Sequence, residues 1–555
     1  MFFPSTSQQS KLTPATAATP NASNTNNSGA NGTNGATSST DANTTAGSAN
    51  TNGTIDANAF KNERITITTD VVKADIDTLG GELVRLELLN YKEAIHQEHW
   101  YDSFLELAGM KPRPIPKNNV VLFNQSAQRT YLAESGLIGG NFPNHKSGFV
   151  AQPGVRTLEN KDQLLLVLEA IQGDVKLVKT YTFKKGSYVI DVKHQVFNQS
   201  SAPINPTLYL QLRHDGTKPT GGSIFTGTAE FYAPAVYTDS DHFQKLDFEK
   251  IEKGTVSHAK QADNGWVAVI EHFFVSAFIP PDKTQREIFT EKVGPNLYTV
   301  GSKIALGNIA PGASTAVDAR LYSGPQESSI LEKVTPGLDL VKDYWYFAII
   351  AKPMFWLMEL IHNMLGNWGW TIILFTIIIK LALFPISAAG FRSMAKMKQM
   401  TPKMTAIRER FKDDTQKMNQ AMMELYKTEK INPLGGCLPM LIQMPIFMSL
   451  YWVLQASVEM RGSPWIGWIH DLTAPDPWFI LPVLYAITMF ITTKLNPAPA
   501  DPMQARMMLF MPLAFSVLFF FFPSGLVLYW VMNNILSIAQ QWVINNKLLP
   551  QEQKS

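Results

Sequence analysis

Cysteine is almost absent from this sequence, in which Cys437 is the only one among 555 residues. No intramolecular disulfide and no cysteine-based metal site can therefore form. A nucleotide-binding glycine loop, a nucleophile elbow and a defined pair of catalytic carboxylates are missing as well. His96-Gln97-Glu98-His99 contains two histidines, but the sequence offers no further ligands for a metal there. We therefore expect neither an enzyme nor a bound metal or cofactor.

Large apolar side chains are almost absent from residues 5–57, which consist mainly of Ser, Thr, Asn, Ala and Gly. Such a segment cannot bury enough surface to offset the entropy lost on ordering. We predict that residues 1–57 form a disordered, low-complexity tether.

Residues 58–325 have the pattern of antiparallel β-strands. Tyr188, Ile190 and Val192 alternate with polar residues, which gives one buried and one wet face. Clusters of Asn, Gly, Pro and Asp punctuate such runs, and more than a dozen short strands would fit. A segment of about 260 residues can be stabilised by burial alone. We predict a large β-sandwich.

The last two hundred residues are dominated by Leu, Ile, Met, Phe and Trp. A helix needs roughly 20 apolar residues to cross about 30 Å of hydrocarbon, and about five segments approach that length. We predict membrane-spanning helices from Trp368 to about Ala389, Cys437 to about Ala456, Trp478 to about Thr493, Met507 to Phe522, and Gly525 to about Asn545. The third and fourth are near the short limit, so we expect the bilayer around them to be thinned.

Residues 338–365 mix aromatic with charged side chains, and Lys352-Pro353 lies in the middle. A spanning helix would place that pair near the centre of the bilayer, at an expense of a few kcal/mol. We predict instead an amphipathic helix that lies in the membrane interface.

Basic residues mark one side of the predicted membrane segment. Residues 390–432 carry ten Lys and Arg against five acids, whereas the loop 457–477 carries only Arg461. Lys494, Arg506 and Lys547 flank later spans on the same side as the basic loop. Because basic loops stay in the cytoplasm, the β domain should lie outside the membrane and the C-terminus in the cytoplasm.

A β domain on the outer side needs a targeting signal, yet no apolar stretch of 15 residues precedes it. Met1-Phe2-Phe3-Pro4 is at most the remainder of one. We expect the natural N-terminus to carry a further hydrophobic helix.

Lys380 is the most unusual residue of the predicted membrane region, because it lies within the apolar run from Ile377 to Leu383. It is about nine residues, or about 13 Å, from the cytoplasmic end of its predicted span, which is farther than a lysine side chain extends to the interface. An intramembrane cation usually faces a protein interior or a hydrated cavity. We predict that Lys380 charges a hydrated groove between helices; the alternative is a structural lysine that leans to the interface or pairs with a neighbour.

Other polar residues of the spans could line such a groove. Thr376 is one turn before Lys380 on the same face. No acidic residue lies deep in any span, which argues against a proton-coupled transporter. For each residue alone, ordinary hydrogen bonding between helices is the favoured interpretation. The remaining candidates are Gln443, Ser449, Gln455, Thr488, Ser516, Asn533, Asn534, Ser537 and Gln540.

The basic loop 390–432 is predicted to be a helical hairpin with apolar side chains at spacings of three, four or seven. Its two stripes could pack against each other, or its methionines could form an adaptable surface for varied client proteins. The basic face would suit anionic lipid or ribosomal RNA. The methionines concerned are Met394, Met397 and Met404 on the first arm, and Met418 and Met422 on the second.

Three segments closely resemble the YidC/Oxa family of membrane protein insertases. These are Asn432 to Phe447 (NPLGGCLPMLIQMPIF), Phe522 to Trp530 (FPSGLVLYW), and Gly265 to Ala268 (GWVA) with Phe273 to Pro280. The resemblance covers about residues 60–548. It implies the form with a large extracytoplasmic domain found in Gram-negative bacteria, and for that domain a β-supersandwich similar to sugar-epimerase folds.

The family implies a hydrophilic groove that opens to the cytoplasm and lipid. Its charged position is usually arginine, and Lys380 occupies it here. Thr376 matches a groove residue, Met444 and Pro445 match client-contacting positions, and Trp530 stands where tyrosine is common. Gln443, Tyr529 and Asn533 complete the substrate groove that we expect.

The resemblance implies insertion and folding of integral membrane proteins through this groove, alone or with the Sec translocon. Expected partners are nascent membrane proteins, Sec components, anionic lipids and, weakly through the basic loops, the ribosome. The expected location is the bacterial inner membrane, with the β domain in the periplasm. The insertase core is expected at residues 366–548. The tail 549–555 is short, so we expect no tail-mediated ribosome binding, and the first helix of the family lies outside this sequence.

Two other functions remain open from the residues. The first is a channel or small-solute transporter with Lys380 as an anion site, although no inverted repeat is visible. The second is a carbohydrate-active β domain on a membrane anchor, for which His194, His214 and Asp215 could be proposed, although nothing in their spacing recommends them.

Overall fold

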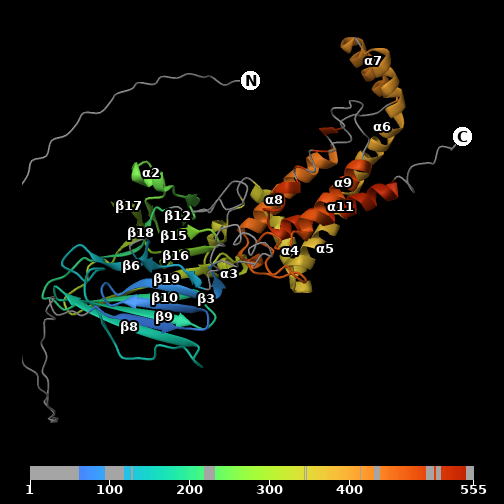
Figure 1. Ribbon diagram of the computed structural model, residues 1–555. Coiled ribbons are helices and arrows are strands. Elements are labelled where there is room, and N and C mark those ends of the chain that lie inside the picture. The colour runs from blue at the N-terminus through green and yellow to red at the C-terminus, as the bar shows by residue number, and fades with distance from the viewer. Residues whose placement is uncertain are drawn as a thin grey trace, which may run out of the picture. The chain divides into compact units, whose positions relative to one another are not determined.

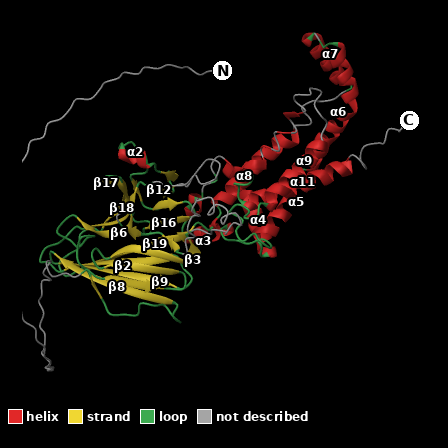
Figure 2. Cartoon of the chain, viewed as in Figure 1, coloured by secondary structure: helices red, strands yellow, loops and turns green. Residues whose placement is uncertain are grey.

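The computed structural model describes residues 62–93, 118–126, 129–217, 232–342, 344, 347–412, 414–429, 438–495, 506–507, 510, 514 and 516–544. The predicted tether, the His96/His99 pair, Cys437 and most of the predicted span from Met507 to Phe522 lie outside these residues. Strands occupy the first part of the chain and long helices the second, as Figures 1 and 2 show.

The described strands form two large sheets in which every pairing between named strands is antiparallel. The ten-stranded sheet has the order β1 (Arg64–Thr68), β2 (Val72–Asp77), β3 (Glu82–Lys92), β6 (Thr130–Ile138), β11 (Thr207–Asp215), β18 (Leu297–Ala305), β17 (Arg286–Gly294), β14 (Gln261–Ala262), with β4 (Asn119–Val121) on β3 and β5 (Asn124–Gln125) on β6. The nine-stranded sheet has the order β13 (His242–Lys245), β12 (Tyr232–Thr238), β15 (Trp266–Glu271), β16 (Phe274–Ile279), β19 (Ser314–Pro325), β10 (Val189–Asn198), β9 (Val175–Lys184), β8 (Gln163–Gln172), β7 (Val150–Ala151). The predicted antiparallel β domain is confirmed.

One apolar core lies between the sheets. Leu86 and Leu210 come from the ten-stranded sheet, and Leu166 and Val192 from the nine-stranded one; all four are almost fully buried in the same cluster. In β9 and β10 buried side chains alternate with exposed or half-buried ones, which is the register that a sheet with one wet face requires. Burial thus holds this domain together, as the shortage of cysteine requires.

Charged side chains are also buried in this core. Lys179 has no exposed surface, and its ammonium donates to the carbonyl oxygens of Gly80 at 2.7 Å and Ser135 at 2.8 Å. Nearby, Arg213 pairs with the buried Glu134 at 2.8 Å. The His194 ring nitrogen Nε2 lies 2.8 Å from the Ser135 hydroxyl. A buried charge that keeps hydrogen-bond partners is tolerated.

The helical part begins after two short connecting elements. The helices are α2 (Phe248–Glu252) within the β domain, then α3 (Ser328–Val334), the 3₁₀ turn η1 (Leu338–Val341), α4 (Ala348–Leu365), α5 (Trp368–Ala382), α6 (Phe384–Arg410), α7 (Thr415–Thr428), α8 (Leu438–Ala456), the 3₁₀ turn η4 (Val458–Met460), α9 (Ile480–Leu495) and α11 (Ser524–Val543). A second apolar cluster includes Phe375 of α5, Val453 of α8, Tyr485 of α9 and Tyr529 of α11.

The predicted span from Trp368 to about Ala389 is not one straight helix. The helix breaks at Leu383, and α5 and the start of α6 are bent by 68°. Pro385 lies two residues after Leu383; it has no N–H, and its ring would clash with a carbonyl of a continuing helix. Among the described helices, none alone is both long and apolar enough to cross a bilayer, whereas the bent pair Trp368–Ala382 and Phe384–Met394 meets both criteria together. Lys380 consequently lies in the last turn of α5, not nine residues before a helix end.

The segment 338–365 is not one continuous helix. Lys342 lies between η1 and α4 and is 3% exposed. Its ammonium is 2.6 Å from Glu459 of η4 and 4.0 Å from the centre of the Phe355 ring of α4. The sequence predicted Lys342 on the surface of an amphipathic helix. It is instead buried, and its side chain connects α4 with η4.

His194 makes the stability of the β domain depend on pH. Burial lowers the pKa of His194 to about 3, so the unfolded chain takes up this proton at a higher pH than the folded chain. The contribution of neutral His194 to the unfolding free energy is complete above about pH 6.5 and is lost as the pH falls towards 3. At pH 5 the loss is about 2 kcal/mol. We expect the fall in unfolding free energy of the β domain between pH 7 and pH 5 to shrink by that amount in His194→Gln.

Thermal or denaturant unfolding of the full chain in detergent, followed by β-sheet circular dichroism, measures this difference. The control is His242→Asn, since His242 is exposed at positive φ, a conformation that Asn tolerates. Equal losses in wild type and His194→Gln would contradict the assignment.

Candidate functional site

Lys380 joins the end of α5 to α11. Its ammonium donates to the Ser537 hydroxyl at 2.8 Å, and Ser537 donates in turn to the carbonyl oxygen of Asn533 at 2.7 Å. The Gln540 side-chain nitrogen donates to the carbonyl oxygen of Lys380 at 3.3 Å. Lys380 is half-buried, and among the described residues no acidic side chain forms an ion pair with it. The positive charge is therefore held by a hydroxyl and is not neutralised by a fixed carboxylate there.

The polar side chains of α11 that surround this contact lie on one face. Trp530, Asn533, Ser537 and Gln540 are spaced by three, four and three residues, which places them in one row along a helix. The row faces Lys380 through Ser537 and Gln540. Sequence analysis named Ser537 and Gln540 only among scattered polar residues. Their spacing with Asn533 is the signal that could have singled them out.

A second polar contact lies between α8 and α11. The Gln443 side-chain amide donates to the Tyr529 hydroxyl, and Tyr529 is 1% exposed. The neighbouring Trp530 ring packs 4.9 Å from the Phe447 ring, centre to centre. The predicted groove residues Gln443, Tyr529 and Trp530 are thus brought together, two turns from Ser537 along α11.

Thr376 lies buried within α5. It is 1% exposed, and its hydroxyl donates to the carbonyl oxygen of Ile372 at 2.6 Å within α5. Pro445 interrupts α8 internally, and the Ser449 hydroxyl donates to its carbonyl oxygen at 2.7 Å. Met444 is 46% exposed, so α8 presents an apolar side chain on its outer surface at this point.

The methionines of the hairpin divide into buried and accessible ones. Met404 of α6 is 4% exposed, and its sulfur lies 3.6 Å from the Tyr426 hydroxyl of α7. Lys403 and Glu429 form an ion pair of 2.6 Å between the same helices. The remaining predicted methionines, Met394, Met397, Met418 and Met422, are half-buried. The stripes of the two helices therefore meet at Met404 and leave part of their methionine surface accessible.

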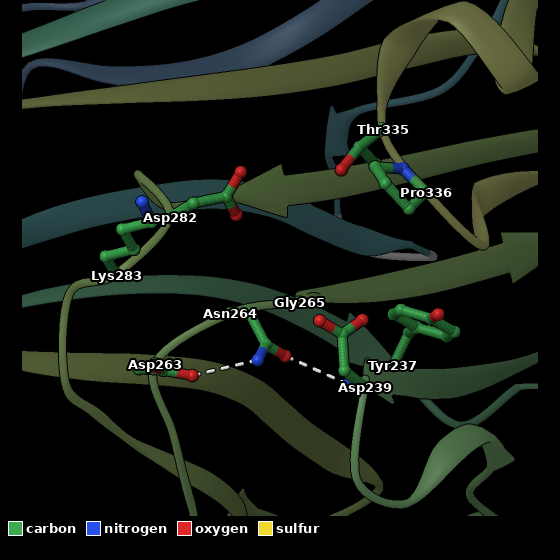
Figure 3. Close-up of a pocket in the computed structure, with 9 residues that line it drawn as sticks. All are labelled: Tyr237, Asp239, Asp263, Asn264, Gly265, Asp282, Lys283, Thr335 and Pro336. Atoms are coloured by element: carbon green, nitrogen blue, oxygen red, sulfur yellow. Dashed lines mark hydrogen bonds between the residues drawn. The ribbon is translucent and has the colours of Figure 1, made fainter.

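A cavity of about 350 Å³ lies in the β domain, away from the histidines proposed for sugar chemistry. Its walls include Tyr237 and several loop residues that carry carboxylates (Figure 3). Gly265, at φ +85°, is required there because a Cβ atom would lie 1.9 Å from the Tyr237 carbonyl oxygen. The full lining is Tyr237, Asp239, Asp263, Asn264, Gly265, Asp282, Lys283, Thr335 and Pro336.

The three residues considered for a carbohydrate enzyme do not gather at this cavity. His194 and His214 are 1% and 3% exposed, and Asp215 accepts hydrogen bonds from the backbone amides of Thr130 and Thr217. Within the described ranges no group of three or more His, Cys, Asp or Glu is placed to hold a metal ion. Lys380 therefore remains the candidate site among the described residues.

Comparisons with known proteins cover nearly the whole chain. A family model described as "YidC periplasmic domain" matches residues 64–357, and one described as "60Kd inner membrane protein" matches residues 360–552. The membrane protein insertase YidC of Herminiimonas arsenicoxydans is 58% identical over 524 residues, which are 92% of this chain and 88% of the relative. That of Cupriavidus necator is 52% identical over 551 residues, 99% of this chain and 92% of the relative.

Among solved structures, an active YidC insertase with its first transmembrane domain resolved matches with a TM-score of 0.39 and 18% identity, over 86% of this chain and 93% of that chain. The two family models and the two relatives agree with the resemblance seen in the sequence motifs. The chain belongs to the YidC family.

Proposed function

We propose that this protein inserts integral membrane proteins into the bacterial inner membrane and helps them fold. Relatives that match most of its length are named membrane protein insertases, and its two halves match a periplasmic domain and an inner membrane protein. Neither alternative, a channel or a carbohydrate-active enzyme, finds support in these relatives. The observation that carries the mechanism is the Lys380 ammonium, which contacts a hydroxyl and, within the described part of the chain, no carboxylate.

The proposed topology has about five spans. They are α5 with the start of α6, α8, α9, residues 507–522 and α11, with the β domain in the periplasm and the basic hairpin of α6 and α7 in the cytoplasm. The charge distribution supports this orientation. The short helix α9, 16 residues long, spans about 24 Å, which supports a locally thinned bilayer.

The proposal places α4 in the membrane interface. Ile349, Trp356 and Met364 are 89%, 64% and 79% exposed, and an exposed apolar face of this kind is typical of an interfacial helix. Lys352, which is 48% exposed and 3.8 Å from Asp339, then remains at the level of the lipid headgroups. In this position the lipid would cover the apolar face of α4, which no other described residue covers.

In the proposed mechanism Lys380 attracts the acidic or polar outer segment of a client protein into a hydrated groove. Hydration lowers the desolvation penalty of that segment, which in hydrocarbon would be several kcal/mol per polar group. The apolar helix of the client then leaves into lipid along α5 and α8, where Leu441 and Met444 are 63% and 46% exposed. The hydrophobic effect and the membrane potential drive release, so neither ATP nor a metal is required.

The proposed partners follow from the charged and apolar surfaces of the hairpin. Met423 is 56% exposed on α7, and flexible methionine surfaces adapt to varied clients. Exposed lysines and arginines on α6 suit anionic lipid or ribosomal RNA. The proposed insertase works alone or with the Sec translocon.

The charge mechanism predicts different effects for two substitutions of Lys380. In liposomes containing the full chain, Lys380→Ala should reduce insertion of a small single-span client with an acidic outer segment by about tenfold, which corresponds to about 1.4 kcal/mol. Lys380→Arg should retain most of the activity because the positive charge remains. Protease protection of the client measures insertion.

Lys396→Ala on the exposed surface of α6 is the matched control, since it removes one basic residue outside the site. It should insert the client as well as wild type does. Unchanged insertion by Lys380→Ala would refute the charge mechanism.

The proposal also predicts that water reaches the Lys380 contact. In a Cys437→Ser background, Ser537→Cys in native membranes should react with a membrane-impermeant thiol reagent, because the reactive thiolate forms only in a hydrated environment. Ile535→Cys, on the exposed apolar surface of the same helix, should react at least tenfold more slowly because lipid surrounds it. An unreactive cysteine at position 537 would show that this depth is dry.

A further inference from the structure

Two buried amide oxygens on α11 have no hydrogen-bond partner among the described residues. They are Oδ1 of Asn533 and Oε1 of Gln540, and the indole nitrogen of Trp530 is unpaired in the same way. Asn533 is 5% exposed. Burial of an unpaired polar atom is costly, and native structures rarely leave one without a partner. Three such atoms in one row indicate that a partner arrives from outside the described protein.

The direction of the Gln540 side chain follows from its contact with α5. Its amide nitrogen donates to the carbonyl oxygen of Lys380, and because a carbonyl oxygen can only accept, the Gln540 oxygen must point away from that carbonyl. Gln540 therefore presents a hydrogen-bond acceptor, its side-chain oxygen, to an incoming ligand, and Asn533 presents its own side-chain oxygen in the same way. The Lys380 ammonium lies between these two positions along α11, through its bond to Ser537.

The chemistry of the row selects the kind of ligand. The oxygens of Asn533 and Gln540 accept hydrogen bonds, so a client carboxylate bound to Lys380 would leave both unpaired. Polypeptide main chain supplies both donors and acceptors, but a formed helix has used most of its N–H groups internally. In an extended segment the main-chain N–H groups are free to donate to a binding site.

The spacing agrees with an extended segment. Asn533 and Gln540 are seven residues apart, which corresponds to about 10 Å along a helix. N–H groups on one side of an extended segment recur every second residue, about 7 Å apart, and the long Gln540 side chain can make up the remaining distance. Lys380 and Trp530 would then donate to carbonyl oxygens of that segment.

We propose that Asn533 and Gln540 hydrogen-bond the main-chain N–H groups of an extended client segment on either side of the Lys380–Ser537 contact. The inference rests on the proposed insertase function and deepens it, because it names the form in which the polar segment of the client is bound. Recognition of the backbone makes binding independent of the client's side chains. Lys380 adds a preference for acidic segments.

The test compares two clients and two versions of the full chain in liposomes. One client has an ordinary acidic outer segment, and the other carries several prolines there, which lack N–H groups. Wild type should insert the ordinary client about fivefold faster for each hydrogen bond that the proline client cannot make. The double variant Asn533→Leu/Gln540→Met should insert both clients equally and at the lower rate.

A melting temperature for each variant separates binding from folding. Asn533→Leu, which removes an unpaired buried oxygen, should leave the melting temperature unchanged or raise it. Gln540→Met also removes the hydrogen bond to the Lys380 carbonyl oxygen, so its single variant measures the stability lost through that bond. Asn534→Leu is the control, because Asn534 donates to the Thr488 hydroxyl at 3.3 Å. It should lower the melting temperature while the preference for the ordinary client remains.

The outcomes distinguish the two proposals. If wild type inserts neither client, the insertase function itself fails. If wild type inserts both clients at equal rates, or the double variant keeps the wild-type preference, backbone recognition by Asn533 and Gln540 is refuted while the insertase function stands.

Discussion

The contact between Lys380 and Ser537 shows the constraint on which the proposed site depends. An ammonium group among apolar helices needs either a counter-charge or hydrogen-bond acceptors with access to water. Here α11 supplies a hydroxyl, and the hydroxyl donates onward to the backbone of its own helix. The charge thus stays available to a third group. A carboxylate in place of Ser537 would fix the position equally well but would neutralise the charge.

The β domain also buries cations, but there their hydrogen-bond partners lie within the fold. Lys179 is surrounded by backbone carbonyl oxygens and lies near Glu82 and Glu134. Arg286, which is 3% exposed, donates to carbonyl oxygens of the loops at Asp263 and Thr284. These cations are saturated within the fold, and they join segments that a chain with one cysteine cannot join by disulfides. Buried charge serves structure in one part of the molecule and, in our proposal, binding in the other.

Features that depend on local periodicity were predictable from the sequence. The alternation around Tyr188 and Ile190 gave the antiparallel sheets, and the apolar lengths gave the helices that became α8, α9 and α11. The break at Leu383 was not foreseen, because the apolar run continues past Pro385 and hydropathy does not register a missing N–H. The burial of Lys342 depends on Glu459, which is 117 residues later, and no local pattern contains such a pair. Likewise Lys380 was identifiable by its apolar neighbours, whereas its partner Ser537 lies 157 residues away.

The choice of lysine at position 380 agrees with the partner that α11 offers. A guanidinium presents several N–H groups in a fixed plane and is best satisfied by two acceptor atoms side by side. Ser537 offers one hydroxyl, and Gln540 turns its donor side to α5, so the adjoining helix presents a single acceptor to the cation at this point. An ammonium needs no planar arrangement and keeps further N–H groups for another ligand. Lysine at position 380 therefore supplies a positive charge that can be shared without the planar geometry that a guanidinium requires.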